Sequence, residues 1–197
     1  YYASRGLGDV YKRQVFHLIP IDIVIDSKVS FYALCALMFS VGLSVGNDPQ
    51  TLKNFRSLNP RLIFLPIMTI LGTLAGSAAV SLILTHRSLT DCLAVGSGFG
   101  YYSLSSIFIT EYKGAELGTI ALLANISREI LTLLAAPLLV RWFGNLAPIS
   151  AGGATTMDTT LPIITRTAGQ QFVVVSIFHG FVVDFSVPFL VTLFCSI

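Results

Sequence analysis

Long apolar runs are the feature that most limits what this chain can fold into. The run from Leu117 to Phe143 is longer than the ~20 apolar residues that a helix needs to cross a bilayer. Of the 197 residues, 54% are hydrophobic and 11% are charged, whereas soluble domains carry about 25% charged residues. A soluble core of this size would leave much of that apolar surface in water. The sequence therefore predicts an integral membrane protein.

Six apolar segments predict an all-α, polytopic membrane bundle. They cover about 29–46, 62–84, 92–110, 117–143, 150–166 and 172–195. The connections between them are short, which is typical of one compact domain. The third and fifth segments are too polar and too rich in glycine to face lipid as regular helices. We expect these two to be interrupted or re-entrant, because irregular backbone at membrane depth must be buried in protein or line a cavity.

The lysines and arginines of the loops predict the orientation of the bundle. If the connection 47–61 is cytoplasmic and every segment crosses, that side carries Lys53, Arg56, Arg61, Lys113 and Arg166, and the other carries Lys28, Arg87 and Arg141. The excess favours a C-terminus outside, in the periplasm of a Gram-negative cell.

Several function classes are excluded by what the sequence lacks. The net charge of +2 is small and its cations are spread out, so no nucleic-acid partner is expected. Cys35, Cys92 and Cys195 have no metal or redox spacing and are read as free thiols. The GSGFG motif is not a dinucleotide fingerprint, because Tyr101 stands where the third glycine belongs. We expect no enzyme activity, cofactor or metal, and no ATPase motif is present.

The two interrupted segments are the candidate binding elements. Their cores are GSGFGYYSLSS over 96–106 and AGGATTMDTTLP over 151–162. In many transporters such half-helices point N-termini at anionic groups, while unwound carbonyls coordinate cations. Glycine lets backbones approach closely, and hydroxyls add ligands. The candidates are Gly98, Tyr101, Ser103, Gly152, Gly153, Thr155 and Thr156. The alternative is that both segments serve packing alone.

The fourth segment carries ionisable residues midway along its length. Asn125, Arg128 and Glu129, with Thr132, follow helical i, i+3, i+4 and i+7 spacing and form one polar stripe. A charge at the bilayer centre costs about 2.5 to 3.5 kcal/mol on insertion scales, so such residues normally face protein or a water-filled cavity. A structural ion pair and a transport function are both open.

Three further ionisable residues are candidates for binding or coupling. Asp158 is flanked by threonines and could attract a cationic substrate, bind a proton or cap a helix. His179 and Asp184 lie five residues apart in the sixth segment, so they serve different helix faces. His179 is either a hydrogen-bonded packing residue or a proton relay.

The chain from Gly96 onwards resembles the bacterial lysine exporter family of the LysO type. The phrases that carry the resemblance are GSGFGYYSLSSIFIT, LGTIALLANISREILTLLAAPLLVRWFG and GGATTMDTTLPIITRTAG, about half of the chain. The resemblance implies an inner-membrane exporter of L-lysine and its analogues, with eight membrane helices, of which these six are the last. It also implies that acidic residues inside the membrane matter for transport. Asp158 falls where one of them is expected.

These observations lead to a hypothesis of lysine export in exchange for protons. Backbone N–H groups and hydroxyls of the two interrupted segments would take the carboxylate, and Asp158 with Glu129 would hold an ammonium group. The alternative is an ion-coupled carrier of another small solute, such as an organic anion anchored by Arg128. Residues 1–14, which are polar and basic, are expected to be a foreign or read-through tail. Residues 15–197 are expected to be a membrane transporter domain that lacks its N-terminal part; the oligomeric state stays open.

Overall fold

The computed structural model describes residues 60–84 and 86–197, together with positions 32, 36, 39 and 43. The tail predicted over 1–14 lies outside these residues, as does nearly all of the first predicted segment, 29–46.

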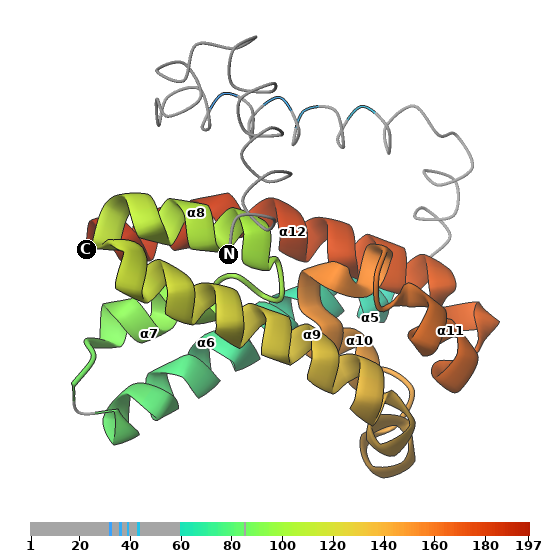
Figure 1. The fold of residues 1–197 in the computed structure, drawn as a ribbon. Helices are drawn as coiled ribbons and strands as arrows, with labels where there is room; N and C mark the ends of the chain where they lie inside the picture. Colours follow the sequence, from blue (N-terminus) through green and yellow to red (C-terminus); the bar gives the residue numbers. More distant parts are fainter. Residues whose placement is uncertain (1–31, 33–35, 37–38, 40–42, 44–59, 85) are drawn as a thin grey trace, which may run out of the picture. The chain divides into compact units, whose positions relative to one another are not determined.

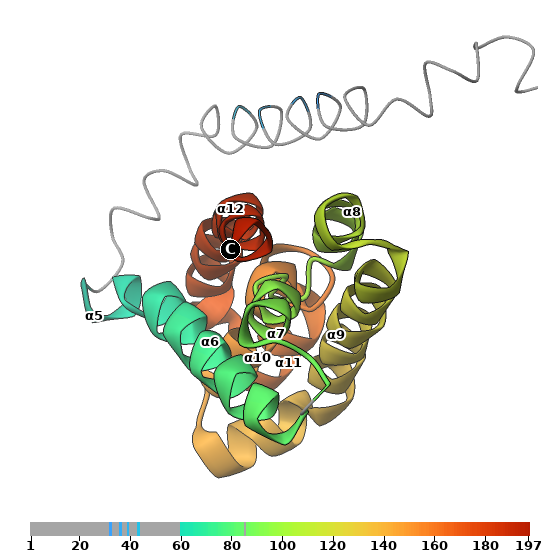
Figure 2. The ribbon, with the colours of Figure 1, turned by 90° about the vertical axis from the view of Figure 1, so that its left-hand side faces the viewer.

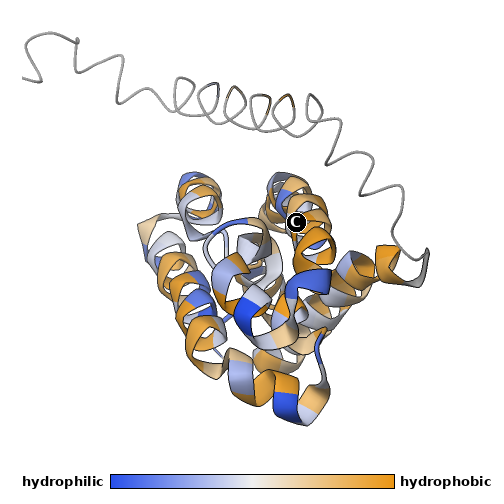
Figure 3. Cartoon of the chain, turned by 90° about the vertical axis from the view of Figure 1, so that its right-hand side faces the viewer, coloured by the Kyte–Doolittle hydropathy of each residue, from blue (hydrophilic) through white to orange (hydrophobic). Residues whose placement is uncertain are grey.

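Three helices in the described part are long and apolar enough to cross a membrane. They are α6 (Leu65–Ile83), α9 (Ala115–Phe143) and α12 (Val173–Ser196), and they confirm the second, fourth and sixth predicted segments. A short helix, α5 (Pro60–Ile63), precedes α6. Large apolar side chains point outward from all three, including Leu82, Leu134 and Phe189, and the helix surfaces are mostly hydrophobic in Figure 3. This exterior suits contact with lipid.

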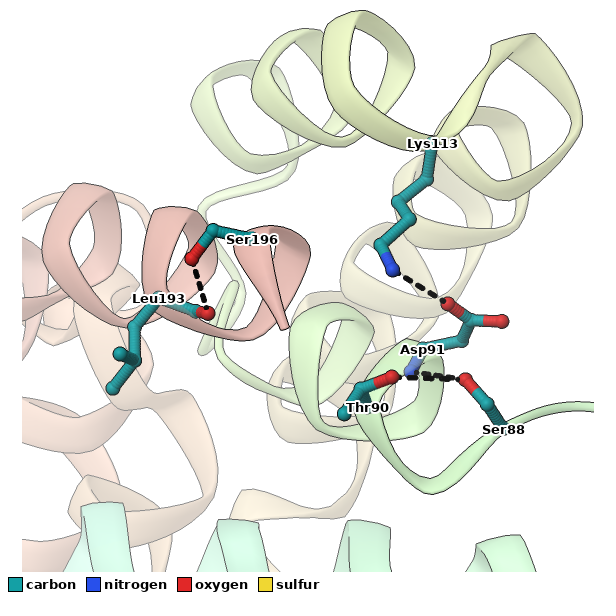
Figure 4. Close-up of polar contacts among 6 residues, drawn as sticks. All are labelled: Ser88, Thr90, Asp91, Lys113, Leu193 and Ser196. Carbon is teal, nitrogen blue, oxygen red and sulfur yellow. Dashed lines mark hydrogen bonds and ion pairs between the residues drawn. The ribbon is translucent and has the colours of Figure 1, made fainter.

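The third predicted segment is a re-entrant hairpin. It forms α7 (Leu89–Gly96) and α8 (Tyr102–Lys113), which are separated by a turn over residues 97–101. α7 begins where the Ser88 hydroxyl accepts the Asp91 N–H at 3.0 Å. Lys113, the last residue of α8, lies 3.8 Å from the Asp91 carboxylate (Figure 4). The start of α7 and the end of α8 therefore lie at the same end of the bundle.

The fifth predicted segment doubles back in the same way from the opposite end. It contains α10 (Ala147–Gly152), the 3-10 helix η1 (Gly153–Met157) and α11 (Leu161–Ala168); the 3-10 helix η2 (Gln170–Phe172) then leads into α12. Ile149 of α10, Ile164 of α11 and Val175 of α12 are buried in one cluster, and the partly buried Val140, near the end of α9, packs against it. The prediction that both polar segments are interrupted or re-entrant is thus confirmed, in the re-entrant form.

The chain alternates spans and hairpins. α6 runs to the end where α12 finishes, which we call the C-terminal end, and α7–α8 enters from there (Figure 1). α9 crosses to the opposite end, α10–α11 enters from that side, and α12 returns. In Figure 2, α7, α10 and α11 lie in the middle, with α6 and α9 on either side and α8 and α12 above.

The hairpins correct one part of the orientation argument. Lys113 lies at the same end as Arg87, since an ion pair joins Arg87 to Glu116 at the start of α9. Arg141, near the end of α9, lies at the opposite end with Arg166 of α11. Counting the third and fifth segments as crossings had placed Lys113 and Arg141 on the wrong sides. The physical reason is that the glycine-rich turns reverse the chain near mid-depth.

Candidate functional site

The tips of the two hairpins meet inside the bundle. We call residues 97–101 the first tip and residues 153–160 the second tip. The Ala154 N–H donates to the Phe99 carbonyl oxygen at 2.9 Å, which joins the tips backbone to backbone. A Cβ at Gly153, where φ is +63°, would overlap that same carbonyl, and one at Gly100 would lie 3.2 Å from the Gly152 oxygen. Glycines at the tips therefore allow the close approach.

Phe99 is an unusual residue at this junction. It is fully buried and has a φ of +46°, the one positive φ at a non-glycine position in the described part of the chain. Its ring lies 5.9 Å from the guanidinium carbon of Arg128. Residues held in such conformations cluster at binding and switch regions. Sequence reasoning did not single out Phe99, although its place between two glycines was a signal.

Asn125 of α9 holds the first tip. Its Oδ1 accepts the Gly100 N–H at 2.8 Å, and its Nδ2 donates to the Val95 oxygen at 3.2 Å and the Ala121 oxygen at 2.9 Å. The side chain is 3% exposed. Gly98 packs directly on this amide, because a Cβ there would lie 2.5 Å from Nδ2. Asn125 therefore fixes the turn between α7 and α8 to a membrane-spanning helix.

Arg128 lies one turn further along α9 and holds the second hairpin. Its Nε donates to the Ala151 oxygen at 2.8 Å, and its Nη2 to the Ser150 oxygen at 3.1 Å. Its Nη1 donates to the Thr73 hydroxyl of α6 at 3.3 Å. Carbonyls at the C-terminal end of a helix carry partial negative charge, so a cation there is stabilising. The bonds give Arg128 a positioning function for α10.

The second tip is held from its other side by α12. Thr156 is fully buried, and its hydroxyl lies 2.8 Å from the Gly153 oxygen, 3.0 Å from the Ser176 oxygen and 3.2 Å from Nδ1 of His179. The other ring nitrogen of His179 lies 2.9 Å from the Thr69 hydroxyl of α6. Both ring nitrogens have protein partners, which favours the packing interpretation of His179. The Thr155 hydroxyl donates to the Gly152 oxygen at 2.9 Å, within the tip.

Two carboxylates and a phenol gather beside the tips. Asp184, in the middle of α12, is 4% exposed, and its carboxylate forms no hydrogen bond with the described residues. It interacts electrostatically with Asp158 of the second tip, and Tyr101 of the first tip interacts with both. Asp158 is exposed, and its carboxylate accepts the Thr159 N–H at 2.6 Å. Residues predicted separately, in three segments, are thus near enough for their charges to interact.

Two predicted site residues stand apart from this group. Glu129 is half-buried on α9, and its carboxylate makes no hydrogen bond or ion pair with the part of the chain that is described. Ser103 is exposed on α8. In contrast, the hydroxyls of Thr69 and Thr73 of α6 form hydrogen bonds with His179 and Arg128, respectively. Sequence reasoning missed these two threonines. Their signal was a row of hydroxyl residues at four-residue spacing, Thr69, Thr73, Ser77 and Ser81, along one face of an otherwise apolar segment.

Together the fold and the site define a helical membrane protein in which two re-entrant segments from opposite ends meet between spanning helices. Interrupted helices that meet near the bilayer midplane are a recurring device of secondary transporters.

Comparison with known proteins gives the family. The family model for lysine exporter LysO matches residues 13–195. The chain is 36% identical to lysine exporter LysO of Escherichia coli over 170 residues, which is 86% of the chain and 56% of that protein. It is 35% identical to a putative lysine exporter of Haemophilus influenzae over 167 residues, 85% of the chain and 84% of that protein. No solved structure matches significantly. The chain belongs to the lysine exporter LysO family, as the resemblance predicted, and spans little more than half of the Escherichia coli relative.

Proposed function

We propose that this chain forms part of a secondary transporter that exports L-lysine across the bacterial inner membrane in exchange for protons. Both relatives carry names that specify lysine export, and their family is a transport class rather than an enzyme class. The spanning helices and re-entrant hairpins support a membrane-embedded path for a small solute.

The observation that carries this proposal is the pair of carboxylates beside the tips. Asp184 is buried near the middle of a spanning helix, and Asp158 lies close enough for their charges to interact. Acidic groups at this depth are costly unless a cation, a proton or a water-filled cavity accompanies them. Lysine offers two ammonium groups. A binding position for one of them at Asp158 and Asp184 satisfies both carboxylates.

Competition between an ammonium group and a proton gives exchange a physical basis. Two nearby ionised carboxylates repel each other, and either a proton or a substrate cation relieves that repulsion. Protonation from outside would weaken the hold on lysine and release it there, while lysine binding from inside would displace the proton. Glu129 and the tip N–H groups stay predictions for the remaining contacts.

The alternative of an organic-anion carrier receives less support from the geometry. In that reading Arg128 is the substrate anchor, but three of its N–H groups bind the Ser150 and Ala151 carbonyls and the Thr73 hydroxyl. Two of its five N–H groups remain for a solute carboxylate, but an organic anion would leave the buried Asp184 without a cation.

The orientation that we propose places the C-terminal end in the periplasm. Arg141 and Arg166 lie at the opposite end, where the chain enters α6 after Lys53, Arg56 and Arg61 in the sequence. Arg87 and Lys113 lie at the C-terminal end. If the sequence that precedes α6 lies at the opposite end, its three cations favour the cytoplasm there.

Lysine efflux tests the proposed function. Cells without their own exporter are loaded through a lysine-containing dipeptide and express this chain, alone or extended to the full length of the longer relative. We expect efflux from an extended chain, no efflux from its Asp158→Asn and Asp184→Asn variants, and normal efflux from Glu111→Gln, which changes an exposed carboxylate on α8. Normal efflux from a well-inserted Asp158→Asn variant would sink the carboxylate assignment. Absence of lysine efflux from every version would overturn the assignment of lysine as the substrate.

A further inference from the structure

A deep cleft lies between α6, α7 and α9, on the Arg128 flank of the first tip. Its volume is about 780 Å³, and its lining includes Thr73 and Ser77 of α6, Cys92 of α7, and Ile120, Asn125 and Arg128 of α9. Along α9 it extends from Leu117 to Arg128, about 16 Å at ~1.5 Å per residue. It therefore reaches from the C-terminal end of the bundle to the depth of the tips.

The two ends of the cleft are polar, although most of its wall is not. Arg87 and Asp91 line the mouth, where they form ion pairs with Glu116 and Lys113. Thr73, Asn125 and Arg128 line the inner end. A lipid chain or an apolar helix would leave these inner polar groups facing hydrocarbon, which is unfavourable. Water and a small polar solute satisfy them.

Arg128 has donors available at the inner end. Its hydrogen bonds use one N–H each of Nε, Nη1 and Nη2, so two of the five N–H groups have no partner among the described residues. A second cleft, of about 450 Å³, begins at the same Ala124 and Arg128 and continues along α9 to Leu139. Arg128 therefore lies where clefts that lead towards opposite ends of the bundle meet.

We propose that the cleft between α6, α7 and α9 is a water-filled passage through which a zwitterionic amino acid moves between the tips and the C-terminal end. The free N–H groups of Arg128 meet the carboxylate of the solute at the inner end. The ion pairs of Arg87 and Asp91 keep the mouth hydrated. The inference rests on the proposed function for its solute, while the passage itself is tested independently of export.

Cys92 is a native probe of this passage, because it lines the cleft and is half-buried. In an extended chain, substituting Cys35 and Cys195 by serine leaves Cys92 as the single thiol of this part. Two further variants start from Cys92→Ser. Ile120→Cys places the single thiol in the cleft, and Leu123→Cys places it outside the cleft. Leu123→Cys is the control. Leu123 is 59% exposed and Ile120 is 39% exposed, so side-chain exposure alone would make the control react faster.

The readout is the rate of labelling by a charged, membrane-impermeant methanethiosulfonate added to intact cells. We expect Cys92 and Ile120→Cys to react at least about tenfold faster than Leu123→Cys, and lysine to slow that reaction. Equal, slow labelling at all three positions would show that water does not enter and would overturn the passage. Faster labelling in inverted vesicles than in intact cells would show that the passage opens to the cytoplasm and would overturn the proposed opening at the periplasmic side. Rapid labelling that lysine leaves unchanged would overturn the amino-acid solute, and normal labelling with no lysine efflux would count against the proposed function alone.

Discussion

Substitution of Gly153 by alanine tests the contact between the two tips most directly. Gly153 has a φ of +63° and a ψ of −125°, and an added Cβ would overlap the Phe99 carbonyl oxygen. That backbone region is essentially restricted to glycine and costs about 1–3 kcal/mol for another residue. Displacing Phe99 also breaks its bond with the Ala154 N–H, which adds about 1–3 kcal/mol if both groups stay buried and unpaired. The expected loss of folding free energy is roughly 2–6 kcal/mol.

Thermal unfolding of the purified protein in detergent measures this loss. For a chain of this size, each ~1 kcal/mol shifts Tm by about 2–4 °C, so we expect Gly153→Ala to lower Tm by about 4 °C or more. Gly72→Ala is the matched control, because no atom lies within 4 Å of its Cβ position in α6. It should leave Tm unchanged or raise it slightly, since alanine favours a helix over glycine by about 0.5–1 kcal/mol. Equal Tm values for Gly153→Ala and the unmodified chain would refute the tip contact.

Two further predictions concern the residues that hold the tips. Arg128→Lys keeps the charge but loses the fork that binds the Ser150 and Ala151 carbonyls, so Tm should fall. Export KM should rise as well, because the free N–H groups that meet the solute are lost, and a rise in KM with an unchanged Tm would contradict the positioning function. His179→Gln retains a side chain able to bond Thr69 or Thr156, so export should keep its pH profile although stability falls by about 1–3 kcal/mol. A displaced pH profile in His179→Gln would restore the proton-relay interpretation.

Much of the candidate site could be read from residue types alone. Glycines, threonines and serines gathered in 96–106 and 151–162 indicated interrupted segments, and the structure confirms them as hairpins. Arg128 and Asn125 were identified because charge and amide groups are conspicuous in an apolar run. The direction of each segment was not readable, since hydropathy is the same whether a chain crosses or turns back at mid-depth. Lys113 and Arg141 were therefore placed on the wrong sides.

The pairing of distant residues was equally beyond the sequence. Asp158 was predicted to hold an ammonium group with Glu129, which stays a prediction, whereas its charge interactions with Asp184 and Tyr101 were not foreseen. Such pairing depends on which helices pack together, and three elements far apart along the chain decide it. Helical spacing gives only the face on which one side chain lies.

The sequence by itself determined that this chain is a helical membrane protein, because so apolar a composition is stable only in lipid, and which segments cannot face that lipid. Only the tertiary structure decided that those segments are opposed hairpins, that Asn125 and Arg128 hold their tips, and that Asp158 and Asp184 are near enough for their charges to interact. Burial preferences are local properties of each residue, whereas hydrogen bonds and charge pairs between segments exist only once packing has fixed their distances.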